Sequence, residues 1–181
     1  SDHQHNIVIR RYGKFVGGSK NFLIKIDLDK EKFKIKKDEI YSTLSRCKTN
    51  VLNNCYHEQK LDDGTYYGDW KNNKFHGDGK FVSKNDDQVF VGQFRNGKIH
   101  GYATYKSKND QIYYEGYWRN GEFNGLGTRY WENGKEFYKG NWKNSKFHGQ
   151  GYYRFEDGSS IDGEWLNGSI NGFAKRVWKI N

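Results

Sequence analysis

The sequence predicts an all-β fold: an elongated, single-layer antiparallel meander of stacked β-hairpin repeats, curved and twisted, with an extra N-terminal β-rich segment. Three observations predict it. A short phrase around a glycine recurs at an almost constant spacing, tight-turn residues follow each copy, and the chain contains 22 glycines and no proline. A fixed period of this length indicates one supersecondary unit stacked on copies of itself.

The repeated phrase defines five units over residues 65–181. Their leading glycines lie 24, 24, 24 and 23 residues apart, at Gly68, Gly92, Gly116, Gly140 and Gly163. The chain is very polar, with a mean hydropathy of −1.12, which is typical of disorder. Disordered chains lack aromatic residues, however, and this chain has 6 Trp, 14 Tyr and 12 Phe. We therefore expect the units to fold.

Each unit is predicted to be one hairpin. In the third unit, an alternating run ends at Trp118, Asn120-Gly121 follows, and a second extended run begins at Phe123. Asn-Gly between two such runs favours a type I′ turn, because both central residues need a positive φ. A two-residue turn predicts the cross-strand pairs, which are Trp118 with Phe123, Gly116 with Gly125, and Tyr114 with Gly127.

In the first unit the same rule pairs Trp70 with Phe75, Gly68 with Gly77, and Tyr66 with Gly79. This register suggests a role for the glycines: because glycine has no Cβ, a neighbouring aromatic ring can lie flat against the backbone. A second set of turn residues joins successive units, as at Asn133-Gly134 and Asp157-Gly158. About ten strands are expected, with the aromatic rings on the concave face of a sheet that must twist.

Residues 1–64 do not share the period. Short alternating runs at residues 7–9, 22–28 and 33–36 favour strands, and residues 38–46 are compatible with a short helix. We interpret residues 1–64 as a β-rich segment that caps the first edge of the array. A divergent earlier repeat is the alternative, because Cys55-Tyr56-His57-Glu58 runs into an Asp-Asp-Gly turn.

The five phrases resemble the MORN (membrane occupation and recognition nexus) repeat family, whose pattern is roughly Y-x-G-x-W-x-N-G-x-x-H-G-x-G. The likeness covers residues 66 to about 178 in five copies in phase. Departures include Phe94 for Trp, Ile161 for the leading aromatic residue, and Ala103 and Ala174 for glycine. The resemblance implies a curved hairpin array with a non-enzymatic role in attaching proteins to membranes or to other proteins, and sometimes in self-association.

The aromatic ladder is the first candidate site. Most of each ring is expected to stabilise the sheet, but a single layer leaves this face uncovered, so partly bare rings could form a groove for a peptide, a helix or a second copy. The candidate groove residues are Tyr66, Trp70, Phe90, Phe94, Tyr114, Trp118, Tyr138, Trp142 and Trp165. The last predicted strand is a second candidate, because its outer edge has no following repeat in this sequence.

The turn tips are the candidate site for anionic lipid. Basic residues flank the same turn in successive units and should line one edge of the array: Lys71, Lys74, Arg95, Lys98, Arg119, Lys143 and Lys146. The net charge of +9 also favours acidic partners. Nucleic acid is disfavoured, because base-stacking rings and basic tips would lie on different parts of the sheet.

No residue pattern indicates catalysis, a metal site or a cofactor. Three histidines recur with the period, at His76, His100 and His148, opposite Asp69, Gln93 and Asn141 in the predicted register. We expect each ring to bond a cross-strand or turn group, since Asn replaces His in two units and keeps a hydrogen bond but not the basicity. No motif of a nucleophile elbow or a phosphate-binding loop is present.

The predicted function is a non-enzymatic scaffold or adaptor that binds a protein partner, a second copy included, with peripheral binding to anionic phospholipid as the alternative. The two cysteines, Cys47 and Cys55, lie outside the repeats in no metal or redox spacing. They disfavour a secreted disulfide scaffold and favour a reducing compartment. We therefore expect a cytoplasmic protein, peripheral to a membrane or the cytoskeleton.

Overall fold

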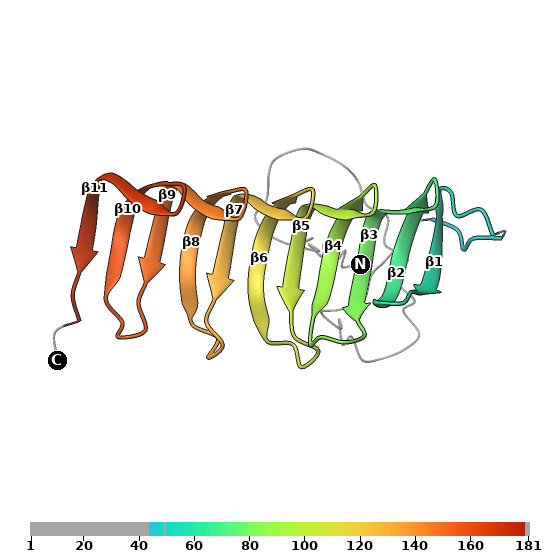
Figure 1. Cartoon of the computed structure of the whole chain (residues 1–181), viewed down its shortest axis with the longest axis horizontal. Coiled ribbons are helices and arrows are strands. Elements are labelled where there is room, and N and C mark those ends of the chain that lie inside the picture. Colours follow the sequence, from blue (N-terminus) through green and yellow to red (C-terminus); the bar gives the residue numbers. More distant parts are fainter. Residues whose placement is uncertain (1–43, 49, 180–181) are drawn as a thin grey trace, which may run out of the picture. The chain divides into compact units, whose positions relative to one another are not determined.

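The structure, a computed structural model, describes residues 44–48 and 50–179, all within one compact unit of residues 40–181. These residues form one open antiparallel sheet in which every strand pairs with its neighbours in the sequence (Figure 1). The predicted all-β meander is confirmed. The strands are β1 (Cys55–Lys60), β2 (Gly64–Lys71), β3 (Lys74–Ser83), β4 (Val89–Arg95), β5 (Lys98–Lys106), β6 (Ile112–Arg119), β7 (Glu122–Tyr130), β8 (Glu136–Lys143), β9 (Lys146–Arg154), β10 (Ser160–Leu166) and β11 (Ser169–Val177). Among the described residues, no helix is long and apolar enough to cross a membrane.

The two-residue turns form as predicted, including the two that lack glycine, Asn72-Asn73 and Asn144-Ser145. Asn120 and Gly121 have φ values of 53° and 90°, and Asn144 and Ser145 have 50° and 59°. The second turn residue also links neighbouring hairpins. The Gly121 N–H donates to the Ile99 carbonyl at 2.9 Å, and the equivalent Ser145 N–H donates to the Phe123 carbonyl at 3.0 Å. One backbone hydrogen bond thus repeats with the sequence period and holds successive units in register.

The predicted register is correct beside the turn and wrong further along each hairpin. Trp118 pairs with Phe123 as expected, but Gly116 pairs with Gly127 rather than with Gly125, and Tyr114 pairs with Arg129. The first hairpin shows the same shift, since Gly68 pairs with Gly79 and Tyr66 with Phe81.

A β-bulge causes this shift of two residues. Between the pairs Trp118–Phe123 and Gly116–Gly127, three residues of β7 lie opposite the single residue Tyr117. Gly125, in the middle of the bulge, has a φ of 98°, a value that strongly favours glycine. The equivalent glycine of each repeat therefore supports the bulge: Gly77, Gly101, Gly125, Gly149 and Gly172. The glycine two residues further on, such as Gly127, receives the tyrosine ring.

The core of this single-layer sheet is two rings deep. In the third repeat, Tyr114 lies across Gly127, whose missing Cβ would fall 2.5 Å from Tyr114 Cζ. Phe123 then stacks on Tyr114 at a centroid distance of 3.8 Å, and Trp118 meets both rings edge-on at 5.2 and 4.5 Å. The Tyr66–Phe75 and Tyr138–Phe147 pairs repeat this stacking at 3.9 Å. The outer phenylalanine row thus covers the tyrosines that a flat single layer would leave bare.

Among the described residues, the first strand of the sheet begins at Cys55, before the predicted start of the array at residue 65. β1 pairs with β2, and the Asn73 N–H donates to the Leu52 carbonyl at 2.8 Å, as the Gly97 N–H does to the Phe75 carbonyl at 2.9 Å. Leu52 therefore takes the place of the phenylalanine that follows the turn in a complete repeat. This geometry favours the divergent earlier repeat, of which β1 is the second strand. The strands predicted over residues 7–9, 22–28 and 33–36 lie outside the described residues.

Residues 45–47 lie along the outer edge of β1 and are tied to it covalently. Arg46 forms a parallel bridge to Tyr56, where the sequence was compatible with the end of a helix. Cys47 and Cys55 form a disulfide with a Cα–Cα distance of 5.0 Å. Spacing alone did not indicate this bond, because the chain reverses between the two cysteines. The cysteine argument for a reducing compartment therefore no longer holds.

Candidate interaction surfaces

The aromatic ladder forms the core of the sheet. Of the nine rings predicted to line a groove, eight are at most 7% exposed, namely Tyr66, Trp70, Phe94, Tyr114, Trp118, Tyr138, Trp142 and Trp165, and Phe90 is partly buried. These rings pack against one another in two clusters that run along the array. Little of their surface is therefore left for a partner, and any groove on this face would consist mainly of the residues that cover them.

The tyrosine hydroxyls stabilise the bulges. Tyr114 donates to the Tyr117 carbonyl at 3.0 Å and Tyr138 donates to the Asn141 carbonyl at 3.0 Å. Tyr117 lies opposite the bulge of its hairpin, and Asn141 lies directly beside the bulge of its own, which falls between Gly140 and Asn141. Burial raises the pKa of Tyr138 to about 12 and also raises the pKa of Tyr114, so both hydroxyls stay protonated and donate at neutral pH.

Tryptophan adds a bond between repeats. The Trp118 Nε1–H donates to the Ala103 carbonyl at 3.1 Å, and the Trp142 Nε1–H donates to the Gly127 carbonyl at 3.2 Å. Trp70 and Trp165 make equivalent bonds to His57 and Gly151 at 3.1 and 2.9 Å. Phe94 lacks this donor. A polar tip on a large apolar ring explains why tryptophan suits this position.

The outer row of apolar side chains is partly exposed on this face. The first four repeats each contribute one residue, at Phe75, Ile99, Phe123 and Phe147, and each packs against the buried rings. These residues lie 24 residues apart, so the position recurs with the sequence period. The predicted register placed Phe75 and Phe123 opposite tryptophan, but neither was expected to contribute to the surface. Their stacking on tyrosine could not be predicted because the bulge was not.

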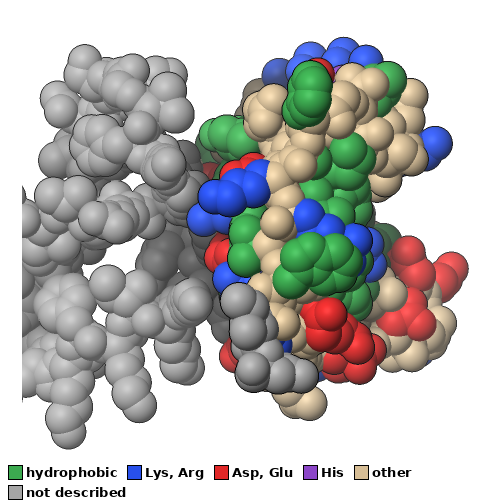
Figure 2. All heavy atoms as spheres, turned by 90° about the vertical axis from the view of Figure 1, so that its left-hand side faces the viewer, with side chains coloured by type: hydrophobic (Ala, Val, Ile, Leu, Met, Phe, Trp, Pro, Cys, Tyr) green, Lys and Arg blue, Asp and Glu red, His purple; other side chains and the backbone are tan. Residues whose placement is uncertain are grey.

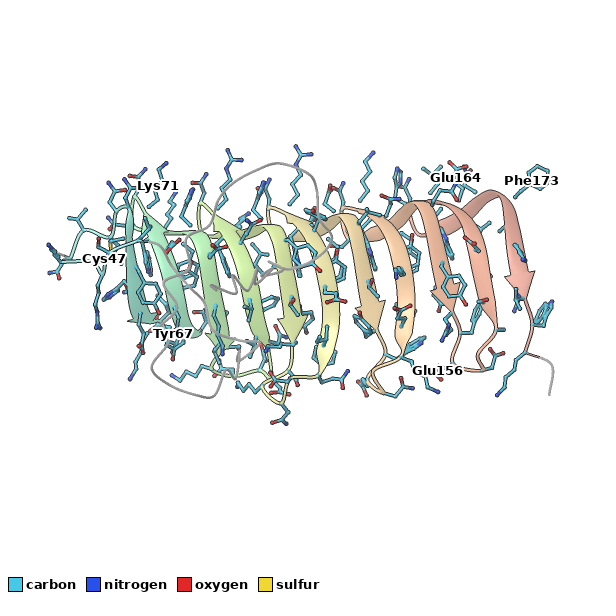
Figure 3. The ribbon with its side chains drawn as sticks, turned by 180° about the vertical axis from the view of Figure 1, so that it is seen from behind. Cys47, Tyr67, Lys71, Glu156, Glu164 and Phe173 are labelled. Carbon is cyan, nitrogen blue, oxygen red and sulfur yellow. A yellow bond between two sulfur atoms is a disulfide. The ribbon has the colours of Figure 1, made fainter. Side chains whose placement is uncertain are left out.

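The seven predicted basic tip residues lie at one edge of the array, and all are exposed. They flank the two-residue turns in directly opposed pairs, Lys71 with Lys74, Arg95 with Lys98, and Lys143 with Lys146. Arg119 instead faces Glu122. Figure 3 shows Lys71 at this edge and Glu156 at the opposite edge, where the connecting turns lie.

The connecting turns carry a more acidic set of side chains. Their acidic residues are Asp62, Asp63, Asp86, Asp87, Asp110, Glu132, Glu156 and Asp157, against the basic residues Lys84, Lys108 and Lys135. The two long edges of the array therefore differ in charge, which would favour one orientation at a charged surface.

β11 is exposed along its whole length. Among the described residues it has a hydrogen-bonded neighbour on one side only, β10. Its apolar side chains reach solvent: Phe173 is fully exposed, and Val177 and the adjacent Trp178 are 50% and 63% exposed. Figure 2 views the sheet from this end and shows hydrophobic side chains open to the viewer, and Figure 3 shows Phe173 projecting outward. Arg176 lies 3.6 Å from the Trp178 ring centroid.

The repeated histidines make only part of the expected contacts. His148 pairs with Asn141 as predicted, whereas His76 and His100 do not pair with Asp69 and Gln93, which pair with Tyr56 and Asp78 on the neighbouring strands. Among the described residues, Nδ1 of His76 and Nδ1 of His148 are buried with no hydrogen-bond partner. His100 Nδ1 lies 3.2 Å from Asn120 Oδ1 in the next turn, which is the expected turn bond. Within the described residues, no group of three or more His, Cys, Asp or Glu side chains is arranged to hold a metal ion.

The opposite face carries a tyrosine and carboxylate cluster that the sequence analysis missed. Tyr130 donates to Glu115 at 2.5 Å, and the Tyr102 and Tyr117 rings meet edge-on at 5.5 Å. Burial, then the nearby Glu115 charge, raises the pKa of Tyr102 to about 12. These residues occupy positions that vary between repeats, so no periodic signal could have identified them.

A comparison with protein-family models agrees with this geometry. The model described as the MORN repeat matches five segments, residues 66–88, 90–111, 114–136, 138–160 and 162–181. Together these segments cover more than half of the chain. No curated protein matches the sequence.

Proposed function

Because the chain belongs to the MORN repeat family, whose repeats are generally modules for binding proteins or membranes, we propose that it is a non-enzymatic scaffold that binds a partner protein by strand addition to β11. The observation that carries this proposal is the exposure of β11. An edge strand presents unpaired backbone N–H and C=O groups, and a partner strand can continue the ladder.

The side chains of β11 define the partner. Phe173 and Val177 offer apolar contact area at the edge, while Lys175 and Arg176 supply positive charge, and β11 contains no acidic residue. Two copies of β11 paired with each other would bring like charges together, which is unfavourable across a strand pair. We therefore favour an apolar strand with acidic side chains, from a different protein, over a second copy.

Charged substitutions on β11 test this proposal. We expect Phe173→Lys with Val177→Lys to abolish partner binding without changing the thermal unfolding midpoint, because both side chains are exposed. The control is Leu126→Lys on the interior strand β7, where the side chain is 61% exposed. Photo-cross-linking from β11 in extract would identify the partner, and binding would then be measured with purified proteins. A partner that binds the double variant and the wild type equally would contradict the proposal. A concentration-dependent dimer lost in the same variant would favour a second copy instead.

A second candidate function is peripheral binding to anionic phospholipid. It rests on the exposed basic row at the turn tips and on the more acidic opposite edge. A lysine or arginine close to an anionic membrane contributes about 1 kcal/mol, and salt weakens the effect. On this view the protein would lie at a membrane surface, with its tip edge toward the lipid.

Charge-reversal variants on the two edges distinguish lipid binding through the tip edge from attraction by the net charge of the protein. We expect the triple variant Lys71→Glu, Lys98→Glu and Lys143→Glu to lose binding to phosphatidylserine vesicles in a flotation assay at low salt. The matched control reverses Lys84, Lys108 and Lys135 in the connecting turns and changes the net charge equally. Equal losses in the two triple variants would mean that net charge, and not the tip edge, drives the binding.

A further inference from the structure

Among the described residues, the divergent repeat offers Trp70 the His57 ring, edge-on at 6.5 Å, but not the tyrosine and phenylalanine rings that later tryptophans receive from the repeat before them. Trp142 contacts Tyr114 and Phe123 of the preceding repeat at centroid distances of 5.6 and 5.2 Å. Trp165 contacts Tyr138 and Phe147 of its preceding repeat at 5.7 and 5.3 Å.

Phe94 likewise contacts Tyr66 and Phe75, at 5.2 and 6.1 Å. Before Trp70, the divergent repeat supplies Leu52 in place of the phenylalanine. No described residue of that repeat supplies a ring at the tyrosine position.

A pocket lies beside Trp70. Its volume is about 440 Å³, within the range of about 300–1,000 Å³ that is typical of ligand sites. Leu52, Leu61, Trp70 and Phe75 form its apolar walls. Leu52, which takes the place of the outer phenylalanine of a complete repeat, therefore borders this pocket together with Trp70.

The pocket lining includes a positive charge, that of Lys74, together with the uncharged Gln59. No acidic residue is among the described residues that line it. Lys74 faces Lys71 across the turn, so the neighbouring charge is also positive. A carboxylate near the mouth would be favoured by both cations.

We propose that this pocket binds an aromatic side chain of an extended peptide segment, with a carboxylate next to it in the peptide. The ring would sit edge-on to Trp70, as Tyr114 does to Trp142. The adjacent carboxylate would lie toward Lys74. This site is at the opposite end of the array from β11 and does not depend on strand addition there.

One substitution introduces into the pocket a ring that the second repeat carries at the equivalent position, Tyr105. The Trp70 Nε1–H bond to the His57 carbonyl matches the Trp118 bond to Ala103, so His57 is equivalent to Ala103. Gln59, two residues further along the strand, is then equivalent to Tyr105 and lines the pocket. We expect Gln59→Phe to close the pocket while preserving or raising stability. Glu58→Phe, on the exposed side of β1, is the matched control.

The test uses the full chain and a defined peptide. The probe is an acetylated, amidated pentapeptide with a central phenylalanine between two aspartates. Binding is followed by the shift of the Trp70 indole N–H signal in a nitrogen-labelled sample, with the other indole signals as internal controls for folding. We expect a saturable shift at Trp70, and binding at least about tenfold weaker in Gln59→Phe and for a peptide with alanine in place of phenylalanine.

The charge is tested separately. Lys74→Glu should weaken binding at low salt more than Lys71→Glu, which makes the same charge change outside the pocket lining. The proposal is overturned if Trp70 does not respond to the peptide, if Gln59→Phe binds it as tightly as the wild type, or if the alanine peptide binds equally well. None of these outcomes depends on β11, so the two binding proposals can fail independently.

Discussion

Replacing Gly127 with alanine is expected to destabilise the array by about 1–3 kcal/mol, as overpacking does in a tight core. The backbone at Gly127 lies outside the left-handed region, so the cost would be steric. An added Cβ would fall 2.5 Å from Tyr114 Cζ and 2.8 Å from Cε2, and even closer to the hydroxyl oxygen. Chemical denaturation of the variant and the wild type measures the difference in the free energy of unfolding.

The five repeats already contain the compensating change. Each tyrosine at this position accompanies a glycine, as Tyr66 with Gly79, Tyr114 with Gly127, and Tyr138 with Gly151, whereas Phe90 accompanies Ala103 and Ile161 accompanies Ala174. We therefore expect Tyr114→Phe to offset part of the cost of Gly127→Ala, because the hydroxyl that meets the new Cβ is gone. The double variant should be more stable than the sum of the single effects by about 1 kcal/mol. Additive effects would contradict the proposed contact between ring and backbone.

Trp118→Ala should cost about 3–5 kcal/mol, the usual range for a large buried aromatic residue. Trp118 is 7% exposed, contacts Tyr114 and Phe123, and bonds the Ala103 carbonyl in the neighbouring repeat. Trp118→Phe should cost only about 1–2 kcal/mol, because the lost hydrogen bond is then the main change. Phe94 occupies the equivalent position in the second repeat, so a phenyl ring is compatible with the fold.

Trp178→Ala provides the matched control for this series. Its ring is 63% exposed, and truncation of an exposed side chain typically changes stability by less than about 0.5 kcal/mol. Circular dichroism during thermal unfolding measures all three variants. Equal effects at Trp118 and Trp178 would show that the ladder is not a core.

The sequence predicted the hairpin array because its strongest signals are local. A type I′ turn needs a positive φ at both central residues, and Asn and Gly adopt this conformation readily. The turn then sets the pairing of Trp118 with Phe123. The bulge was not predicted because every glycine of the motif was expected to make room for a ring. Gly125 instead supplies the positive φ of the bulge, whereas Gly127 makes room for the Tyr114 ring. The spacing of the glycines does not distinguish these two roles.

The binding surfaces were harder to predict than the fold. The sequence identified which residues form the ring ladder, but burial depends on Phe123 stacking over Tyr114, which follows from the bulge. The basic tips were placed correctly because a turn position is exposed by nature. The pocket beside Trp70 depends on a divergent repeat without a period of its own, and the Cys47–Cys55 bond depends on a chain reversal between the two cysteines.

Oxidative footprinting of the tryptophans tests the central claim most directly, namely that the ladder is the core and that partners bind at the ends and edges. Hydroxyl radicals modify a side chain in proportion to its exposure, so mass spectrometry can rank the six indoles in one experiment on the native protein. We expect Trp178 to react fastest and Trp118, Trp142 and Trp165 to be strongly protected. Reaction of Trp118 and Trp142 at a rate close to that of Trp178 would contradict the account.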